Sequence, residues 1–288
     1  MPAAKSAAKK PAAKASKKAA QSPALASALA HTRALLAIPS ATNRVEDVAD
    51  YVVAHAKKRG FKAERQADDT LHIRIEGTDK KRVVGYGAHL DRIGLMVDEL
   101  FDDGTVKISS IGGLFPGHVM DGVTASIQTK NGLEEGVIFH TDTPIHKVGG
   151  EGFEKRPHKW KNIRLRPDAC IGCTKKNGKD KLKALGIRPG QLVWLNPMLA
   201  ISDEHQTLRS RWLDNTLGCA VLLALIDTWG KAKPRFTVDL IFSAAEEVGM
   251  GGTSVIRPDM TDFVAVDTSV GEEMEDLNNC AIKQKAGK

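Results

Sequence analysis

A change of pattern along the chain divides this sequence into α/β and β-rich parts. From Gly104 to about Pro197, short segments such as TVKISSI, EGVIFH and QLVWL are separated by Gly, Pro, Asn and Asp. Such spacing predicts a small all-β module or barrel. On either side, helical and strand patterns alternate, as they do in α/β proteins. The sequence therefore predicts an α/β domain with a mixed sheet, interrupted by an inserted β-barrel-like domain.

The expected elements follow from local signals. A helix should begin at Ser22-Pro23, where Ser caps and Pro occupies the first turn, and a second should span about Asn43 to Arg59 with Gly60 as its stop. Strands are expected at Leu71–Ile75 and Val83–Ala88. After the insert, an apolar helix (NTLGCAVLLALIDTWG) precedes two strands (FTVDLIF and FVAVDTS). We expect four segments: a tail at 1–21, catalytic parts at 22–103 and 198–288, and the insert at 104–197.

The formal charge of +7 is concentrated at the N-terminus. The first 20 residues hold six lysines and no acid, so the remainder is close to neutral. An Ala/Lys/Pro segment cannot bury a core, and we expect it to be disordered, with weak contact to polyanions as its plainest role. It contains no aromatic residues and no nucleic-acid reading motif, which argues against sequence-specific DNA binding.

Cysteine content and hydropathy indicate a cytoplasmic protein. Four cysteines are too few and too scattered for a disulfide framework. The Cys170 and Cys173 pair has no second pair at metal-binding spacing, so a surface turn with two ordinary thiols is expected. No apolar run reaches the roughly 18 residues of a membrane-spanning helix, so no membrane partner is predicted.

Polar residues stand where α/β elements meet loops. His89 and Asp91 follow the apolar strand VVGYGA, where the imidazole can bind a metal and the carboxylate can orient it. Asp214 directly precedes the apolar helix, where an isolated Asp is by default a helix cap. Ligands in open α/β sheets bind at the carboxyl ends of strands, so these positions carry functional information.

Three more carboxylates follow later strands. Glu246 and Glu247 come directly after FTVDLIF, and two adjacent carboxylates are costly to hold together unless a proton or cation separates their charges. Asp267 ends the strand FVAVDTS, where it can also be an ordinary turn residue. Taken together, one imidazole, several carboxylates and a spare Glu predict a hydrolytic zinc or cobalt site.

Four ordered motifs, AHLDRIGLMV, SRWLDNTLG, AAEEVGMGGTSVI and FVAVDTS, resemble those of a metallopeptidase family. This is the dinuclear metallo-aminopeptidase family of glutamyl, deblocking and tetrahedral shell-forming aminopeptidases. LGIRPGQLVWLNP resembles the family segment that leaves the insert. The similarity covers about residues 25 to 270.

The resemblance implies roles for the residues at the matching positions. His89 and Asp267 would bind one of two divalent ions (zinc or cobalt, or else manganese), Asp214 would bridge both, and Glu247 would bind the second. Glu246 would be the general base, and Asp91 would orient His89. The insert would form a homodimer or larger homo-oligomer, and a peptide N-terminus would be the substrate.

The sequence departs from the family at the second metal. The family uses a further histidine downstream of the Asp267 position. Here 21 residues follow Asp267 and none is histidine, His205 being the last in the chain. The resemblance therefore implies a complete first site, a second site without its usual histidine, and a C-terminally shortened member of doubtful activity.

Three functions compete at this point. The leading one is a metal-dependent aminopeptidase acting on short peptides, and the second is a catalytically impaired remnant that only oligomerises or binds partners. Metal content separates these two. A glycoside hydrolase also uses paired carboxylates, but adjacent Glu246 and Glu247 cannot flank a sugar bond from opposite sides, and His89 would have no role.

Overall fold

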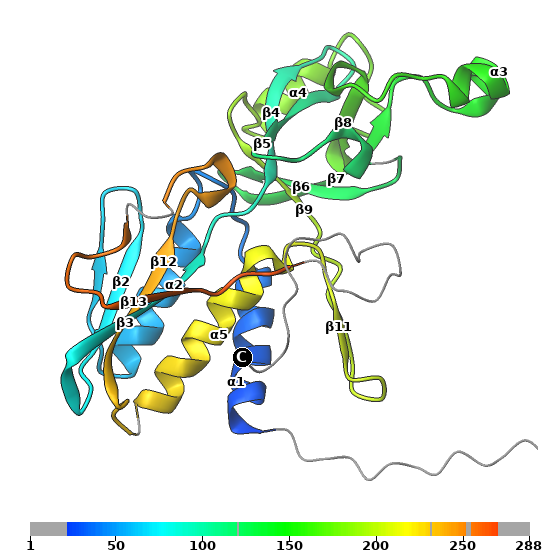
Figure 1. The fold of residues 1–288 in the computed structure, drawn as a ribbon. Helices are drawn as coiled ribbons and strands as arrows, with labels where there is room; N and C mark the ends of the chain where they lie inside the picture. The colour runs from blue at the N-terminus through cyan, green and yellow to red at the C-terminus, as the bar shows by residue number, and fades with distance from the viewer. Residues whose placement is uncertain (1–21, 120, 231, 252–254, 270–288) are drawn as a thin grey trace, which may run out of the picture.

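The computed structural model describes residues 22–119, 121–230, 232–251 and 255–269 (Figure 1). These residues form an α/β part and, beside it, a closed barrel from which one short helix projects. The predicted fold class, a mixed-sheet α/β domain with an inserted barrel, is confirmed. The predicted disordered tail at 1–21 lies outside the described residues, as does the end of the chain from residue 270.

The α/β part is built on a five-stranded mixed sheet with the strand order β1-β2-β12-β3-β13. Strand β12 pairs antiparallel with β2 and parallel with β3, and β3 pairs parallel with β13. Since β3, β12 and β13 run in parallel, their carboxyl ends meet at one edge of the sheet. The strands span Ala63–Arg65 (β1), Leu71–Ile75 (β2), Asp79–His89 (β3), Phe236–Ser243 (β12) and Asp262–Ala265 (β13).

Helices α1 (Pro23–Leu36), α2 (Glu46–Lys58) and α5 (Leu213–Trp229) share one hydrophobic core with β2 and β12. The Ser22 hydroxyl caps α1 by accepting from the Leu25 N–H at 3.2 Å, as predicted. Helix α2 begins three residues after the predicted Asn43, because Asn43 has a left-handed backbone (φ 62°) that a helix cannot contain. Helix α5 is apolar on nearly all sides because it lies between α1, α2 and the sheet.

Leu223, on α5, lies at the centre of this core with none of its surface exposed. Replacing Leu223 by Ala should lower the free energy of unfolding by about 2–5 kcal/mol, because the cavity left behind adds to the lost transfer energy. Denaturant unfolding followed by circular dichroism measures the change. Val221→Ala, on the same helix but 38% exposed, is the control and should shift stability far less. Equal losses in the two variants would contradict this placement of the core.

The barrel is a closed sheet with the strand order β4-β5-β8-β7-β6-β9. Its interior is filled by aliphatic side chains, among them Val106, Ile108, Ile127, Ile138 and Leu165, all with no exposed surface. Helices α3 (Ile145–Glu154) and α4 (Gly178–Ala184) lie in the strand connections, and α3 is the projecting helix of Figure 1. The strands span Gly94–Leu100 (β4), Val106–Ile111 (β5), Thr124–Thr129 (β6), Gly132–His140 (β7), Ile163–Pro167 (β8) and Leu192–Leu195 (β9).

The first barrel strand precedes residue 104, where the sequence places the start of the insert. Strand β4 begins at Gly94, only five residues after His89, so the polar motif passes almost directly into the barrel. The division of the chain into domains remains a prediction.

A buried arginine joins the two parts. Arg92 lies between β3 and β4, donates to the carbonyl oxygens of Leu35 and Ile38 at 3.1 Å each, and has its guanidinium 4.8 Å from the ring centre of Trp194. Burial lowers the pKa of Arg92 to about 10, so the group keeps its charge at neutral pH. This contact connects the end of α1 to strand β9 and fixes the barrel against the α/β part.

Two short elements complete the described chain. A hairpin of β10 (Ala200–Ser202) and β11 (Thr207–Arg209) follows β9 along the chain and projects away from the barrel before α5 begins. Among the described residues, no helix is both long and apolar enough to cross a membrane.

Cys170 is buried in the barrel core, not in a surface turn as expected, and burial together with Cys173 raises the pKa of its thiol to about 12.

Candidate metal centre

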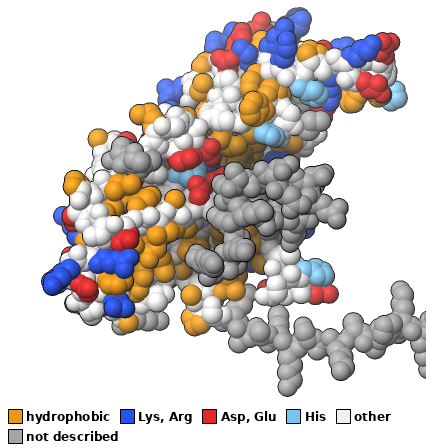
Figure 2. Space-filling model, in the orientation of Figure 1, with side chains coloured by type: hydrophobic (Ala, Val, Ile, Leu, Met, Phe, Trp, Pro, Cys, Tyr) orange, Lys and Arg blue, Asp and Glu red, His pale blue; other side chains and the backbone are white. Residues whose placement is uncertain are grey.

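Polar residues lie at the carboxyl ends of the parallel strands β3, β12 and β13, at one edge of the sheet. His89 is the last residue of β3, Glu246 and Glu247 lie in a short 3-10 turn after β12, and Asp267 follows β13. Acidic side chains gather around a histidine in the hollow between the α/β part and the barrel (Figure 2). The predicted convergence of these residues at the strand ends is therefore observed.

His89 is the centre of this group and is only 3% exposed. Its Nε2 lies 3.0 Å from Asp214 Oδ1, 3.7 Å from Glu246 Oε2 and 3.9 Å from Asp267 Oδ1. One ligand atom each from His89, Asp214 and Asp267 lie within 4.8 Å of one another. An imidazole and carboxylates of this kind are the ligands that zinc and related divalent ions prefer.

The electrostatics of His89 point the same way. Burial disfavours the charged ring, but hydrogen bonds to Asp91 and the charges of Asp91 and Glu246 outweigh it and raise the pKa of His89 to about 9. The surrounding carboxylates thus create a field that attracts positive charge. The residues present therefore suit a divalent cation, both in donor type and in charge.

Asp214 owes its position to an irregular helix start. Asp214 and Asn215 have non-helical backbone angles, and the peptide bond between them is cis. Asn215, which sequence reasoning missed, accepts from the Gly218 N–H at 3.0 Å and donates to the Val266 carbonyl at 2.8 Å. Asn215 thus caps the regular helix, so Asp214 does not take the alternative role of a helix cap, and Asn215 also connects this helix start to the segment carrying Asp267. Asp214 is left free to face His89, with 62% of its side chain exposed.

Asp91 lies behind His89 and the glutamate turn, and it has no exposed surface. Its backbone carbonyl lies 2.8 Å from His89 Nδ1, whereas its carboxylate is 3.5 Å from the same nitrogen. The carboxylate instead accepts from the N–H groups of Glu246 and Glu247 at 3.1 and 3.2 Å and from the Thr42 hydroxyl at 2.7 Å. Asp91 therefore links the His89 ring to the turn that carries both glutamates.

The two glutamates point to different neighbours. Glu246 lies beside His89, while Glu247 Oε1 accepts from the Ile93 N–H at 3.3 Å. Burial, the largest cause, and the charges of Asp214 and Asp91 raise the pKa of Glu247 to about 7. At this edge of the sheet, the group of described residues whose ligand atoms lie within 4.8 Å of one another consists of His89, Asp214 and Asp267, and Glu247 is not part of it. Its predicted role as second-metal ligand remains a prediction.

A cavity of about 500 Å³ adjoins these acids. Asp214 and Glu247 border it, and so do apolar side chains of the α/β part and the barrel. Arg211 and His118 are its basic members. A mostly apolar hollow beside polar, chargeable groups is typical of a small-molecule or peptide side-chain site. The apolar lining consists of Ile93, Leu114, Leu195 and Trp212.

Comparison with known proteins agrees with this geometry. A family model described as M42 glutamyl aminopeptidase matches residues 70–288, and the chain belongs to this family. A putative aminopeptidase of Bacillus subtilis, YhfE, is 31% identical over 239 residues, which cover 82% of this chain. The match covers 66% of the Bacillus protein, so this chain spans just under two thirds of that relative's length.

Solved structures share the fold. An aminopeptidase from the archaeon Desulfurococcus kamchatkensis superposes with a TM-score of 0.73 at 21% identity, covering 90% of this chain and 68% of that one. The TET1 peptidase of Pyrococcus horikoshii, which can assemble into a tetrahedron or a large octahedral shell, gives a TM-score of 0.64 at 20% identity, covering 84% and 68%. At these identities the likeness establishes the fold.

Proposed function

We propose that this protein is a metal-dependent aminopeptidase that releases N-terminal residues from short peptides. The observation that carries the proposal is the meeting of His89, Asp214 and Asp267 within 4.8 Å at the carboxyl edge of the sheet. Membership of the M42 family supports the peptidase class. The ions we propose are zinc or cobalt, with manganese as a further candidate.

In this proposal His89, Asp267 and Asp214 would hold one ion, and Glu247 together with Asp214 would hold a second. When bound, such an ion supplies Lewis acidity and lowers the pKa of a bound water towards neutrality. Asp91 keeps the His89 ring oriented through the hydrogen bond between its carbonyl and Nδ1.

Glu246 is the proposed general base. Its carboxylate is half exposed and lies 3.7 Å from His89 Nε2. Glu246 therefore reaches the candidate metal centre, although the Asp214 carboxylate lies closer to His89. A base in this position can take a proton from water and pass it to the departing amine. The Asp91 carboxylate holds the backbone of this residue through the Glu246 N–H, and that bond fixes the direction of the base.

The adjoining cavity suggests the substrate class. Leu114, Leu195 and Trp212 form an apolar lining next to Asp214 and Glu247, so an apolar N-terminal side chain fits the hollow while its α-amine faces the acids. The proposed partner is therefore a peptide with an apolar first residue. Assembly into a homodimer or larger homo-oligomer through the barrel is proposed from the shell-forming structural neighbour.

The deciding experiment measures metal stoichiometry and hydrolysis together on the purified full chain. Elemental analysis should find one or two tightly held divalent ions. Leucyl and phenylalanyl chromogenic substrates should be cleaved faster than lysyl ones, and N-acetylated analogues should resist. Chelator treatment should remove activity, and zinc, cobalt or manganese should restore it. An absence of both metal and turnover would favour the catalytically impaired remnant.

A further inference from the structure

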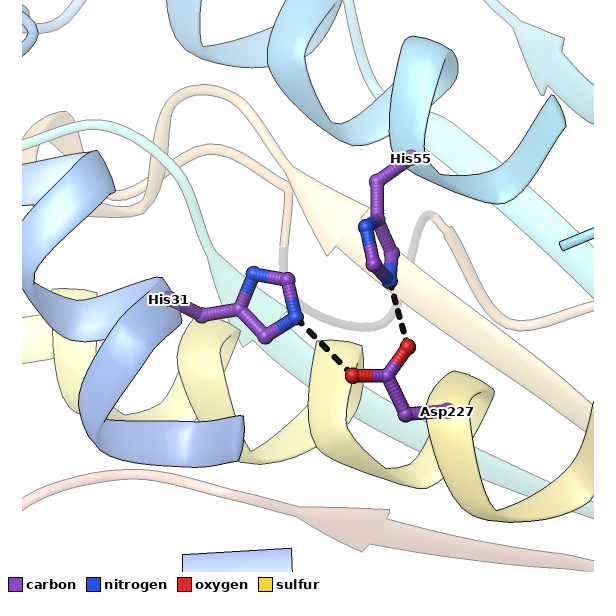
Figure 3. Close-up of side chains that lie close together, drawn as sticks. All are labelled: His31, His55 and Asp227. Carbon is purple, nitrogen blue, oxygen red and sulfur yellow. Dashed lines mark hydrogen bonds and ion pairs between the residues drawn. The ribbon is translucent and has the colours of Figure 1, made fainter. Parts of the chain in front are cut away.

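Away from the candidate metal centre, three helices bring two histidines and a carboxylate together (Figure 3). His31 of α1 and His55 of α2 both direct Nε2 towards Asp227 of α5. The Nε2 of His31 lies 3.3 Å from Asp227 Oδ2, and that of His55 lies 2.9 Å from Oδ1. One ligand atom from each residue lies within 4.8 Å of the others. Sequence reasoning singled out none of these three residues.

The spacing suits a small tetrahedral ion. Ligand atoms about 2.0–2.1 Å from a tetrahedral zinc are about 3.3 Å from each other, close to the separations from each histidine to Asp227. The two imidazole rings are 4.4 Å apart between centres and inclined at 81°, so they approach the carboxylate from different directions.

Neighbouring polar groups hold these side chains in place. The Tyr51 hydroxyl lies 2.9 Å from His31 Nδ1, and the Ser27 hydroxyl donates to Asp227 Oδ2 at 2.5 Å. A hydrogen bond on the second ring nitrogen is the usual support of a metal-bound histidine. The histidine and aspartate side chains are largely buried, with 7%, 13% and 17% exposed for His31, His55 and Asp227.

A cation already occupies one side of this group. Arg59 Nε lies 2.6 Å from Asp227 Oδ1, the oxygen that also faces His55. Unlike the other members, Arg59 is 38% exposed, so its side chain can move into solvent. A surface cavity of about 350 Å³, bordered by Ser27, Arg59 and Asp227, gives access from outside.

We propose that His31, His55 and Asp227 form a second divalent-metal site, remote from the reaction centre, which joins α1, α2 and α5. Two imidazoles and one carboxylate select zinc or a similar transition ion over magnesium or calcium, which prefer all-oxygen ligands. A water completes the coordination. Without the ion, the Arg59 guanidinium supplies the positive charge beside Asp227, and its side chain moves into solvent when the ion binds. The role is structural, since binding ties together three helices of the α/β core.

The test uses a background that lacks two proposed ligands of the reaction centre, Asp214→Asn with Asp267→Asn. Zinc is titrated into chelator-stripped full-length protein against a chromogenic chelator, and thermal unfolding is followed with and without zinc. We expect one equivalent of zinc and a rise in melting temperature. Adding His55→Gln should weaken binding by at least about tenfold, because loss of even a supporting group behind a ligand costs about 10–100-fold.

Arg59→Gln makes the test independent of folding defects, because this side chain is partly exposed and its removal should improve binding. Loss of the competing charge should tighten zinc binding by roughly tenfold. His205→Gln, at an exposed histidine of the β10–β11 turn, is the matched control and should change nothing. Zinc binding that is unaltered by both Arg59→Gln and His55→Gln would overturn the proposal. Because the background lacks two reaction-centre ligands, neither result depends on the proposed peptidase activity.

Discussion

Replacing Glu246 by Gln should reduce kcat for aminoacyl substrates by about 10²–10⁴-fold, the range contributed by a general base. Gln keeps the shape of the side chain but cannot accept a proton. Metal content should stay close to that of the unchanged protein, because Glu246 is not among the proposed ligands His89, Asp214 and Asp267. Steady-state kinetics and elemental analysis on the same sample measure both quantities.

Glu247→Gln is the matched comparison, because it changes the adjacent residue in the same way. As the proposed second-metal ligand, Glu247 should influence metal content, so this variant should lose bound ion together with activity. Full activity in Glu246→Gln would show that Glu246 is not the base. Equal loss of metal in both variants would show that the two glutamates do not divide the roles proposed for them.

The general architecture could be predicted because its signals are local. Apolar strands and helices alternate in 22–103 and after residue 198, and the short β segments between them have a different spacing, so both parts were identified. The carboxyl ends of β3, β12 and β13 could be expected to meet because parallel strands align their ends. His89 ends β3, Glu246 and Asp267 follow the other two strands, and the structure brings the three side chains together. The roles assigned to them remain predictions.

Other features depend on contacts between distant segments, which local patterns do not encode. Thr42 and Asn215 look like ordinary turn and helix-start residues, yet Thr42 donates to Asp91 across 49 positions and Asn215 reaches Val266. His31 and His55 read as polar positions on amphipathic helices. Only the packing of α1 and α2 against α5 brings them to Asp227. The irregular start of α5 was also unpredictable, because an Asp before an apolar helix normally caps it.

Asp91→Asn should damage both stability and activity, because this carboxylate carries three hydrogen bonds at a position with no exposed surface. An amide keeps one acceptor oxygen and places an NH2 group against an N–H or hydroxyl donor. At least one buried donor then loses its partner, which costs about 1–3 kcal/mol. The turn carrying Glu246 and Glu247 loses its anchor at the same time.

The effect on function should come through metal affinity. Loss of a supporting group behind a ligand typically weakens metal binding or activity by about 10–100-fold, and here the same residue also accepts from the backbone N–H of Glu246, the proposed base. Zinc titration, kcat/KM and denaturant unfolding of Asp91→Asn should therefore all change together. Asp98→Asn, on β4 with 40% of its side chain exposed and paired with Lys107, is the control and should alter none of them. Unchanged metal affinity in a folded Asp91→Asn variant would show that the backbone carbonyl at His89 Nδ1 orients the ring without help from the carboxylate.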